Sequence, residues 1–166
     1  MSAEALTRAK NLLGDAITAS HAYRGDETLV IDPLRVVAVM RALRDDEELA
    51  LDFLVDLTAV DYLGREPRFE VVYHLRSMKT GARLRVKAPL AEPEDGTNPS
   101  IDSVVALWPG ANWFEREVWD LYGIKFAGHP DLRRILMYEE FVGHPLRKDY
   151  PKERRQPLVR RDPNEG

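Results

Sequence analysis

A period-two alternation of apolar and polar residues within residues 53–87 constrains the fold more than any other feature of the sequence. Turn-forming residues interrupt the alternation twice, so that it occupies three segments: 53–60, 69–76 and 83–87. Because successive side chains of a strand point to opposite faces, the pattern predicts an antiparallel meander with one buried and one largely solvated face. In the first strand it places four apolar residues on one face: Phe53, Val55, Leu57 and Ala59.

Helical patterns precede this meander. An amphipathic helix is expected over residues 4–20, followed by a short strand over residues 28–31. Asp32 and Pro33 provide an N-cap and a first-turn proline, which predicts a helix over residues 33–44. The apolar stripe of that helix should be Val36, Val39, Met40 and Leu43. The pattern also permits a short helix over residues 47–52.

Two more helical segments follow the meander, after a loop of acidic and turn-forming residues at 89–99. The first is expected over residues 101–108. The second should begin at Asn112, which forms a capping box with Glu115, and should end at Gly123. Its predicted apolar stripe is Phe114, Val118, Leu121 and Tyr122.

These elements predict an α+β fold, an antiparallel sheet meander with helices packed on one face and an extended C-terminal tail. The globular domain is expected over residues 1–142 and the tail over residues 143–166. Prolines recur every six residues in the tail, which rules out a continuous helix there. The tail has a formal charge of +3 on a chain whose net charge is −4, so it suits binding along another protein, with disorder as the alternative.

The absence of cysteine excludes three kinds of site at once. Disulfides, Cys-ligated zinc and thiolate-held iron–sulfur clusters all need cysteine side chains, and the sequence has none. The apolar runs are far shorter than the roughly 20 residues that span a bilayer, so association with a membrane is expected only through partners. The mild net charge and the balanced charge around the three tryptophans argue against nucleic-acid binding.

The most distinctive motif lies between residues 115 and 151. It begins with EREVWDLYG at 115–123, continues with GHPDLRRIL at 128–136 and ends with GHPLRKDYP at 143–151. Here the chain resembles the family of the C subunit of complex I, the proton-pumping NADH:quinone oxidoreductase. The residues that match the signature of that family at its fixed spacing are Glu115, Arg116, Glu117, Asp120, Leu121, Tyr122, His129, Arg133, Ile135 and Leu136.

The resemblance implies a small accessory subunit without a redox centre of its own. The complex as a whole uses FMN, iron–sulfur clusters, NADH and quinone, and the family sits peripherally on the cytoplasmic side of the bacterial inner membrane. The implied partners are other peripheral-arm subunits, chiefly the D subunit, which builds the quinone site, and its cluster-bearing neighbours. The residues expected to contact partners are Glu115, Arg116, Glu117, Asp120, His129, Arg133, Arg134, Pro145, Leu146, Arg147, Lys148, Asp149 and Tyr150.

The charges of the motif also allow a direct physical interpretation. On a helix, Glu115 and Glu117 point away from each other, so they cannot act as a paired acid and base. Arg116 and Asp120 are four residues apart and are expected to pair along one face. No nucleophile motif, phosphate-binding loop or dinucleotide fingerprint occurs, so no catalytic residue is predicted.

Two other functions remain open from the sequence. Ferredoxin- or deazaflavin-linked oxidoreductases and energy-converting hydrogenases use homologous subunits, and the sequence does not identify the electron donor. A free-standing metal-dependent hydrolase would have to use His129, Asp131 and His144, but these lack the i, i+4 helical spacing of a zincin. We therefore predict no metal site.

Overall fold

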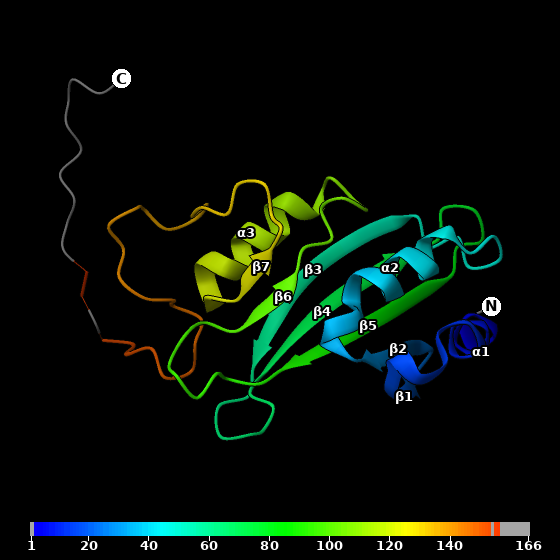
Figure 1. The fold of residues 1–166 in the computed structure, drawn as a ribbon, viewed down its shortest axis with the longest axis horizontal. Helices are drawn as coiled ribbons and strands as arrows, with labels where there is room; N and C mark the ends of the chain where they lie inside the picture. Colours follow the sequence, from blue (N-terminus) through cyan, green and yellow to red (C-terminus); the bar gives the residue numbers. More distant parts are fainter. Residues whose placement is uncertain (1, 154, 157–166) are drawn as a thin grey trace.

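The computed structural model describes residues 2–153 and 155–156. In chain order the elements are α1 (Ser2–Leu13), η1 (Gly14–Ala16), β1 (Ile17–Tyr23), β2 (Asp26–Ile31), η2 (Pro33–Arg35), α2 (Val36–Asp45), β3 (Phe53–Asp61), β4 (Phe69–Arg76), β5 (Arg83–Leu90), β6 (Ser100–Asp102), α3 (Ala111–Tyr122) and β7 (Lys125–Ala127). In Figure 1 the elements follow this order from blue at α1 to yellow at β7. None of the described helices is long and apolar enough to cross a membrane.

The main sheet contains five strands in the order β1-β2-β5-β4-β3, and β6 and β7 form a separate parallel pair. The meander β3–β4–β5 is antiparallel, as predicted, and the α+β fold is confirmed. The strand β2 pairs with β5 in parallel, which makes the sheet mixed. Sequence alternation does not reveal this pairing, because it shows the faces of a strand and not its neighbours.

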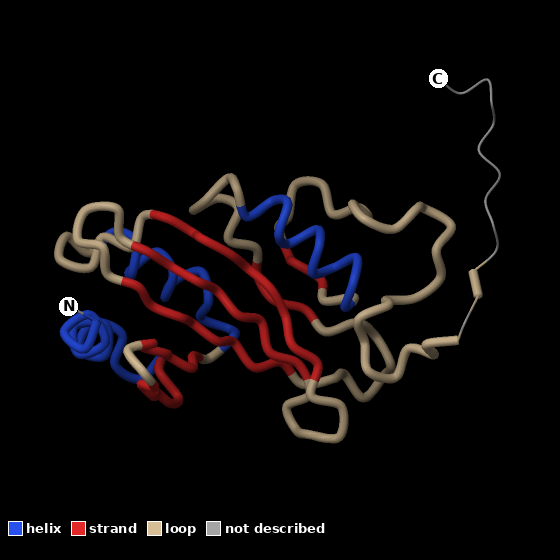
Figure 2. Tube along the Cα trace, turned by 180° about the vertical axis from the view of Figure 1, so that it is seen from behind, coloured by secondary structure: helices blue, strands red, loops and turns tan. Residues whose placement is uncertain are grey.

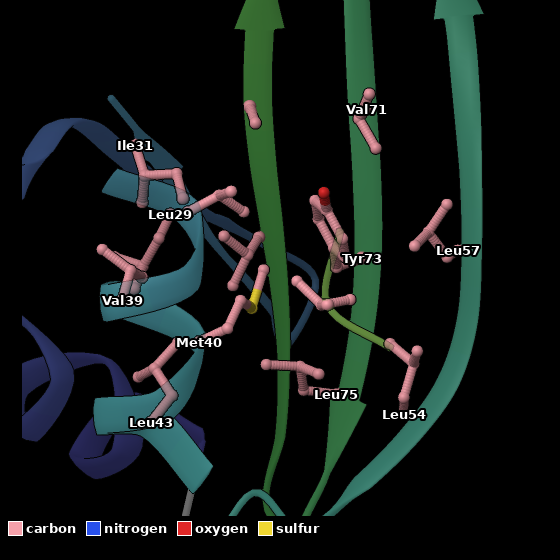
Figure 3. Packing of buried hydrophobic residues seen from close by; sticks show 14 of the residues in the cluster. Leu29, Ile31, Val39, Met40, Leu43, Leu54, Leu57, Val71, Tyr73 and Leu75 are labelled. Carbon is pink, nitrogen blue, oxygen red and sulfur yellow. The ribbon is translucent and has the colours of Figure 1, made fainter. Parts of the chain in front are cut away.

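The helices cover one face of the sheet. The predicted stripe of α2 is fully used, since Val36, Val39, Met40 and Leu43 are all buried. Figure 3 shows Val39, Met40 and Leu43 of this stripe packed against strand residues that include Leu29, Tyr73 and Leu75. Seen from behind in Figure 2, the described helices leave the opposite face of the central strands uncovered.

A β-bulge corrects the predicted faces of β3. Leu54 pairs with Leu75 and Asp56 with His74, so Val55 is an extra residue in β3. The bulge reverses the alternation: Leu54 and Leu57 are buried, whereas Phe53 and Val55 are 49% and 45% exposed. The predicted face Phe53–Val55–Leu57–Ala59 is therefore split between the two sides of the sheet.

Three helical predictions are wrong. The first helix ends at Leu13, and residues 17–23 instead form β1, which pairs with β2 through a two-residue turn at Arg24 and Gly25. Residues 47–52 contain a turn and no helix; Asp46 accepts hydrogen bonds from the N–H groups of Glu48 and Leu49. Ile101 lies in β6, paired in parallel with β7, and only a turn follows over residues 105–107.

Candidate partner-binding surface

The helix α3 directs its two glutamates in opposite directions. Glu117 is exposed, whereas Glu115 is fully buried and accepts hydrogen bonds from Val104 N (2.7 Å) and Ser103 Oγ (2.6 Å). The predicted capping box is therefore wrong: the N-cap is Gly110, which makes no side-chain cap, and Glu115 binds the segment after β6. The buried carboxylate fixes α3 to that segment.

Burial raises the pKa of Glu115 to about 7, although the hydrogen bonds from Ser103 and Val104 act in the opposite direction. An acid whose pKa is higher in the folded chain binds a proton on folding. Its stabilising contribution is complete below the ordinary pKa of 4.5 and is lost as the pH rises through about 7. Glu115 thus makes the stability of the domain sensitive to pH near neutrality.

Replacing Glu115 with glutamine should remove this pH dependence. The free energy of unfolding of the wild type should fall by up to about 3 kcal/mol more than that of Glu115→Gln between pH 4.5 and about 7.5. Urea unfolding at a series of pH values measures the difference. Glu117→Gln, on the exposed side of the same helix, is the control and should parallel the wild type; identical slopes for wild type and Glu115→Gln would contradict the assignment.

Asp120, a residue of α3, binds the backbone of the turn at residues 135–137, which follows β7 in the chain. Its side chain is fully buried, and its Oδ2 accepts hydrogen bonds from the N–H groups of Ile135 (3.1 Å), Leu136 (2.8 Å) and Met137 (2.8 Å). Its Oδ1 pairs with Arg134 Nη1. Burial alone raises the pKa of Asp120, but the N–H groups of Met137 and Leu136 and the Arg134 guanidinium outweigh burial and hold the pKa below its ordinary value.

Two arginines complete the attachment of this segment. Arg134 also donates to the carbonyls of Phe141 (2.9 Å) and Gly143 (3.0 Å). Arg116 donates to the carbonyls of Arg133 (3.1 Å) and Arg134 (3.0 Å). The predicted pairing of Arg116 with Asp120 is thus wrong among the described residues, because both side chains bind residues 133–137 instead of each other.

Residues 144–147 cap the C-terminal end of α3. Helix ends leave four carbonyl groups without an intrahelical partner. In α3 the carbonyl of Trp119 accepts from Gly123 N, and the next three accept from His144 Nδ1 (2.9 Å), Leu146 N (3.0 Å) and Arg147 Nε (2.6 Å). As predicted, Gly123 ends the helix with φ +77, and the His144 ring packs so closely that a Cβ at Gly123 would lie 2.6 Å from it.

Beyond this cap, a buried ion network attaches residues 148 and 149. Arg68 makes two hydrogen bonds of 2.9 Å to Asp61 and contacts Glu92 (2.8 Å) and Asp149 (3.0 Å). Lys148 N donates to Asp61 Oδ2 at 2.7 Å. The sequence interpretation missed Asp61, Arg68 and Glu92, because they are far in sequence from the motif that they contact.

The remaining predicted residues are placed as follows. His129 Nε2 lies 3.2 Å from the carbonyl of Asn112, and its Nδ1 accepts from Asp131 N at 3.0 Å. The ring of Tyr150 stacks on Phe141 with centroids 6.0 Å apart. Pro145 is half-buried beside the His144 cap. Within the described residues, His129, Asp131 and His144 do not come together as a group of metal ligands.

Residues 136–146 also expose large apolar side chains. Leu136, Tyr138, Val142 and Leu146 are 57%, 39%, 54% and 47% exposed, and Trp113 of α3 is 63% exposed. Arg116 links Trp113 to the segment, since its guanidinium lies 5.4 Å from the centre of the indole ring. We call these five apolar residues the C-terminal apolar surface. Large apolar side chains that are exposed on one contiguous surface are typical of protein–protein interaction sites.

Comparison with known proteins decides the family. The pattern of the family described as the respiratory-chain NADH dehydrogenase, 30 Kd subunit, matches residues 29–156. The C subunit of the NADH-quinone oxidoreductase of Roseiflexus sp. (strain RS-1) is 53% identical over 149 residues, 90% of this chain and 83% of that protein. This chain belongs to the C-subunit family. The corresponding protein of Citrifermentans bemidjiense is 50% identical over 147 residues, 89% of this chain and 88% of that protein.

A solved structure shows that the fold of the C-subunit family extends further. A chain in the membrane-bound sulfane sulfur reductase, an archaeal respiratory membrane complex, superposes with a TM-score of 0.75. The likeness covers 91% of this chain and 86% of that chain at 23% sequence identity. At this identity the likeness concerns the fold alone. The resemblance inferred from residues 115–151 is confirmed at the level of the family by the family model and the curated relatives.

Proposed function

We propose that this chain is an architectural subunit, without a redox centre, in the peripheral arm of a proton-translocating NADH:quinone oxidoreductase. It packs against the D subunit, which builds the quinone site, and its cluster-bearing neighbours, on the cytoplasmic side of the membrane. Other subunits hold the FMN and the iron–sulfur clusters that carry electrons from NADH to quinone. Membership of the C-subunit family supports this proposal.

The observation that carries the proposal is that the polar and the apolar groups of residues 133–150 face different ways. Their polar groups bind the body of the same chain, through Asp120, Arg68 and the end of α3. Their apolar side chains are left facing outward as the C-terminal apolar surface. Hydrogen bonds and ion pairs to the rest of the chain hold the segment in place, and its exposed side chains are apolar. Such a contact surface is preorganised, so little conformational entropy is lost when a partner binds.

The predicted partner residues contribute in two ways under this proposal. Asp120, Arg134 and Arg147 position the segment from within and do not need to touch a partner. Glu117, Arg133 and Lys148 are exposed, and they are suited to polar contacts at the rim of an interface. The basic tail beyond Tyr150 extends the contact along the partner, although residues 154 and 157–166 lie outside the described part of the chain.

Replacing Leu136 and Leu146 together with serine should weaken retention in the assembly. Burying a leucine side chain contributes roughly 1.5–3 kcal/mol, so the double variant should bind its partners at least about tenfold less tightly. Because both side chains are largely exposed, the melting temperature of the isolated chain should change by less than about 2 °C. The measurement is the amount of this chain in the peripheral arm purified in mild detergent, together with the NADH:quinone reductase rate.

Two further variants sharpen the experiment. Leu34→Ser, at an 87% exposed position before α2, is the matched control and should leave retention unchanged. Deletion of residues 151–166 tests the tail separately and should lower retention without abolishing it. Wild-type retention by the leucine double variant would contradict the proposed contact, and wild-type retention by the deletion variant would remove the tail from it.

A further inference from the structure

The strand β1 leaves one of its two edges without a partner. It is the last strand at one end of the five-stranded sheet, and it pairs with β2 in regular register from Ala19 to Tyr23 (Figure 1). Hydrogen-bonded and non-hydrogen-bonded pairs alternate along an antiparallel ladder, so every second residue of β1 directs its N–H and C=O groups away from β2. In the described part of the chain no strand pairs with this side, which we call the outer edge of β1.

The hairpin turn indicates which backbone groups face the outer edge. The turn between β1 and β2 has two residues, and Tyr23 is paired with Asp26 directly across it. In such a turn the N–H group of the last flanking residue donates to the C=O group of the first, so the alternation begins with a hydrogen-bonded pair at Tyr23. Ser20 and Ala22 then fall on the non-hydrogen-bonded positions of the ladder, and their N–H and C=O groups point to the outer edge.

The strand β1 lacks the residues that usually protect an exposed sheet edge. Its sequence, ITASHAY, contains no Lys, Arg, Asp, Glu or Pro. A bulge near Ile17 disturbs only its first residues. The strand at the opposite end of the sheet, β3, differs, because it carries Asp56 and Asp61 and lies beside α3. An edge without charges or proline readily takes up another strand.

Tyr23 adds a side-chain contact to the outer edge. It is 67% exposed, although it belongs to a strand. A strand added to β1 would place its side chains about 5 Å from those of β1 on each face of the sheet, close enough for aromatic and β-branched pairs to stabilise the contact. The small side chains of Ala19 and Ala22 leave space for larger ones in the added strand.

We propose that the outer edge of β1 binds an extended segment of a neighbouring polypeptide, which adds a sixth strand to the sheet. Ser20 and Ala22 exchange backbone hydrogen bonds with that segment, and one of its apolar side chains packs on Tyr23. The segment is poor in charged residues, because β1 itself offers no charge with which they could pair. Strand addition of this kind is a recurring mode of peptide recognition. The inference rests on the proposed function, since it requires a neighbouring polypeptide.

This contact is distinct from the C-terminal apolar surface. The strands β1 and β3 form opposite edges of the sheet, and four inter-strand spacings separate them by about 19 Å. Residues 133–150 are attached on the β3 side, where Lys148 N donates to Asp61. A strand bound to β1 would therefore hold the subunit at a second, remote point.

Hydrogen exchange of the isolated chain and of the purified peripheral arm tests the backbone pairing. The amides of Ser20 and Ala22 should exchange at least about tenfold more slowly in the arm, because the added strand accepts them. The amide of His21, which already faces β2, is the internal control and should slow less. Equal exchange of Ser20 and Ala22 in the isolated chain and in an arm that retains the chain would overturn the proposal.

A photo-crosslinking amino acid in place of Tyr23 identifies the occupant in the whole assembly. We expect an adduct with one neighbouring polypeptide, mapped by mass spectrometry to a segment with few charged residues. The same group at Met78, which is also 67% exposed and lies in the turn between β4 and β5, is the matched control and should not label that segment. An adduct with a second copy of this chain, or no adduct in an intact assembly, would contradict the inference.

Proline at position 22 separates strand addition from contacts made by side chains alone. Ala22→Pro removes one outward N–H group and leaves the ladder with β2 intact, since proline is tolerated where the N–H group of an edge strand faces solvent. The yield of the Tyr23-site adduct should fall at least about fivefold, as expected for the loss of a backbone hydrogen bond. Ala22→Val, which keeps the N–H group, is the control and should give the wild-type yield.

A second proline variant covers a failure of the first to fold. Ser20→Pro removes the other outward N–H group and should lower the yield similarly. Wild-type yield in a folded proline variant would show that the neighbouring polypeptide does not pair with β1 as a strand.

The two levels of inference fail in different ways. If the wild-type chain does not co-purify with peripheral-arm subunits, the proposed function fails and the inference with it. If the chain co-purifies but the outer edge of β1 gains no protection from exchange, only the inference fails.

Discussion

Replacing Asp120 with asparagine should destabilise the chain by about 3–5 kcal/mol, the usual cost of breaking a buried ion pair by removing one partner. The change leaves the Arg134 guanidinium, which is only 15% exposed, without its counter-charge. It also weakens the acceptor for the N–H groups of Ile135, Leu136 and Met137. Urea unfolding measures the loss, and hydrogen exchange at those three amides should accelerate more than exchange in β4.

The pH dependence of this effect has a defined sign. The pKa of Asp120 is lowered in the folded chain, so its contribution is present above its ordinary pKa of 3.8 and is lost as the pH falls through the folded value. The variant and the wild type should therefore converge in stability in strong acid. Glu117→Gln, an exposed change on the same helix, should alter stability by less than about 0.5 kcal/mol. A cost below about 1 kcal/mol for Asp120→Asn would contradict the role of Asp120.

Replacing Arg68 with methionine should have an effect of similar size, about 3–5 kcal/mol. Arg68 is 5% exposed and Asp61 is fully buried, so the variant leaves a carboxylate in the interior without its cation. The pKa of Asp61 is subject to burial, which raises it, but the hydrogen bonds from Arg68 and Lys148 N keep it below its ordinary value. Loss of Arg68 should raise this pKa, which chemical-shift titration of the Asp61 carboxyl carbon measures.

A double variant separates the ion pair from simple packing. Adding Asp61→Asn to Arg68→Met removes the buried charge as well as its partner, so the pair of changes should cost less than Arg68→Met alone. Attachment of Asp149 should be lost in both variants, because its ion partner is Arg68. A double variant less stable than Arg68→Met would show that the charge pair does not explain the cost.

The sequence predicted the meander and α2 well, because each depends on a repeating local pattern. It failed for β1, where residues 14–20 continue an apolar periodicity that suits a helix. The missed signal was the two-residue turn formed by Arg24 and Gly25, whose φ angles are 54° and 86° respectively. Such turns join adjacent strands and favour glycine. Residues 17–23 also include β-branched and aromatic residues that strands favour.

The contacts of the candidate residues within the chain were not predicted, and their role toward partners stays a prediction. Asp120 was singled out by the spacing of the motif and Arg134 as a residue expected to contact partners, but the three backbone N–H groups at Asp120 belong to a turn that no periodicity describes. Glu115 resembled a cap because its distance from Asn112 fits one. In the structure the Glu115 carboxylate instead accepts hydrogen bonds from Val104 N and Ser103 Oγ. The buried N–H group of Val104 needs such an acceptor, because an unsatisfied buried donor is costly. The Arg68 network joins distant parts of the chain and leaves no local signal.

The capping of α3 by residues 144–147 has a consequence for biosynthesis. A ribosome makes the helix roughly twenty residues before it makes His144, Leu146 and Arg147, so the last carbonyls of the emerging helix remain bound to water until that segment arrives. The final turn of α3 and the surface built on it therefore become complete together, late in translation. A prematurely terminated chain would lack both.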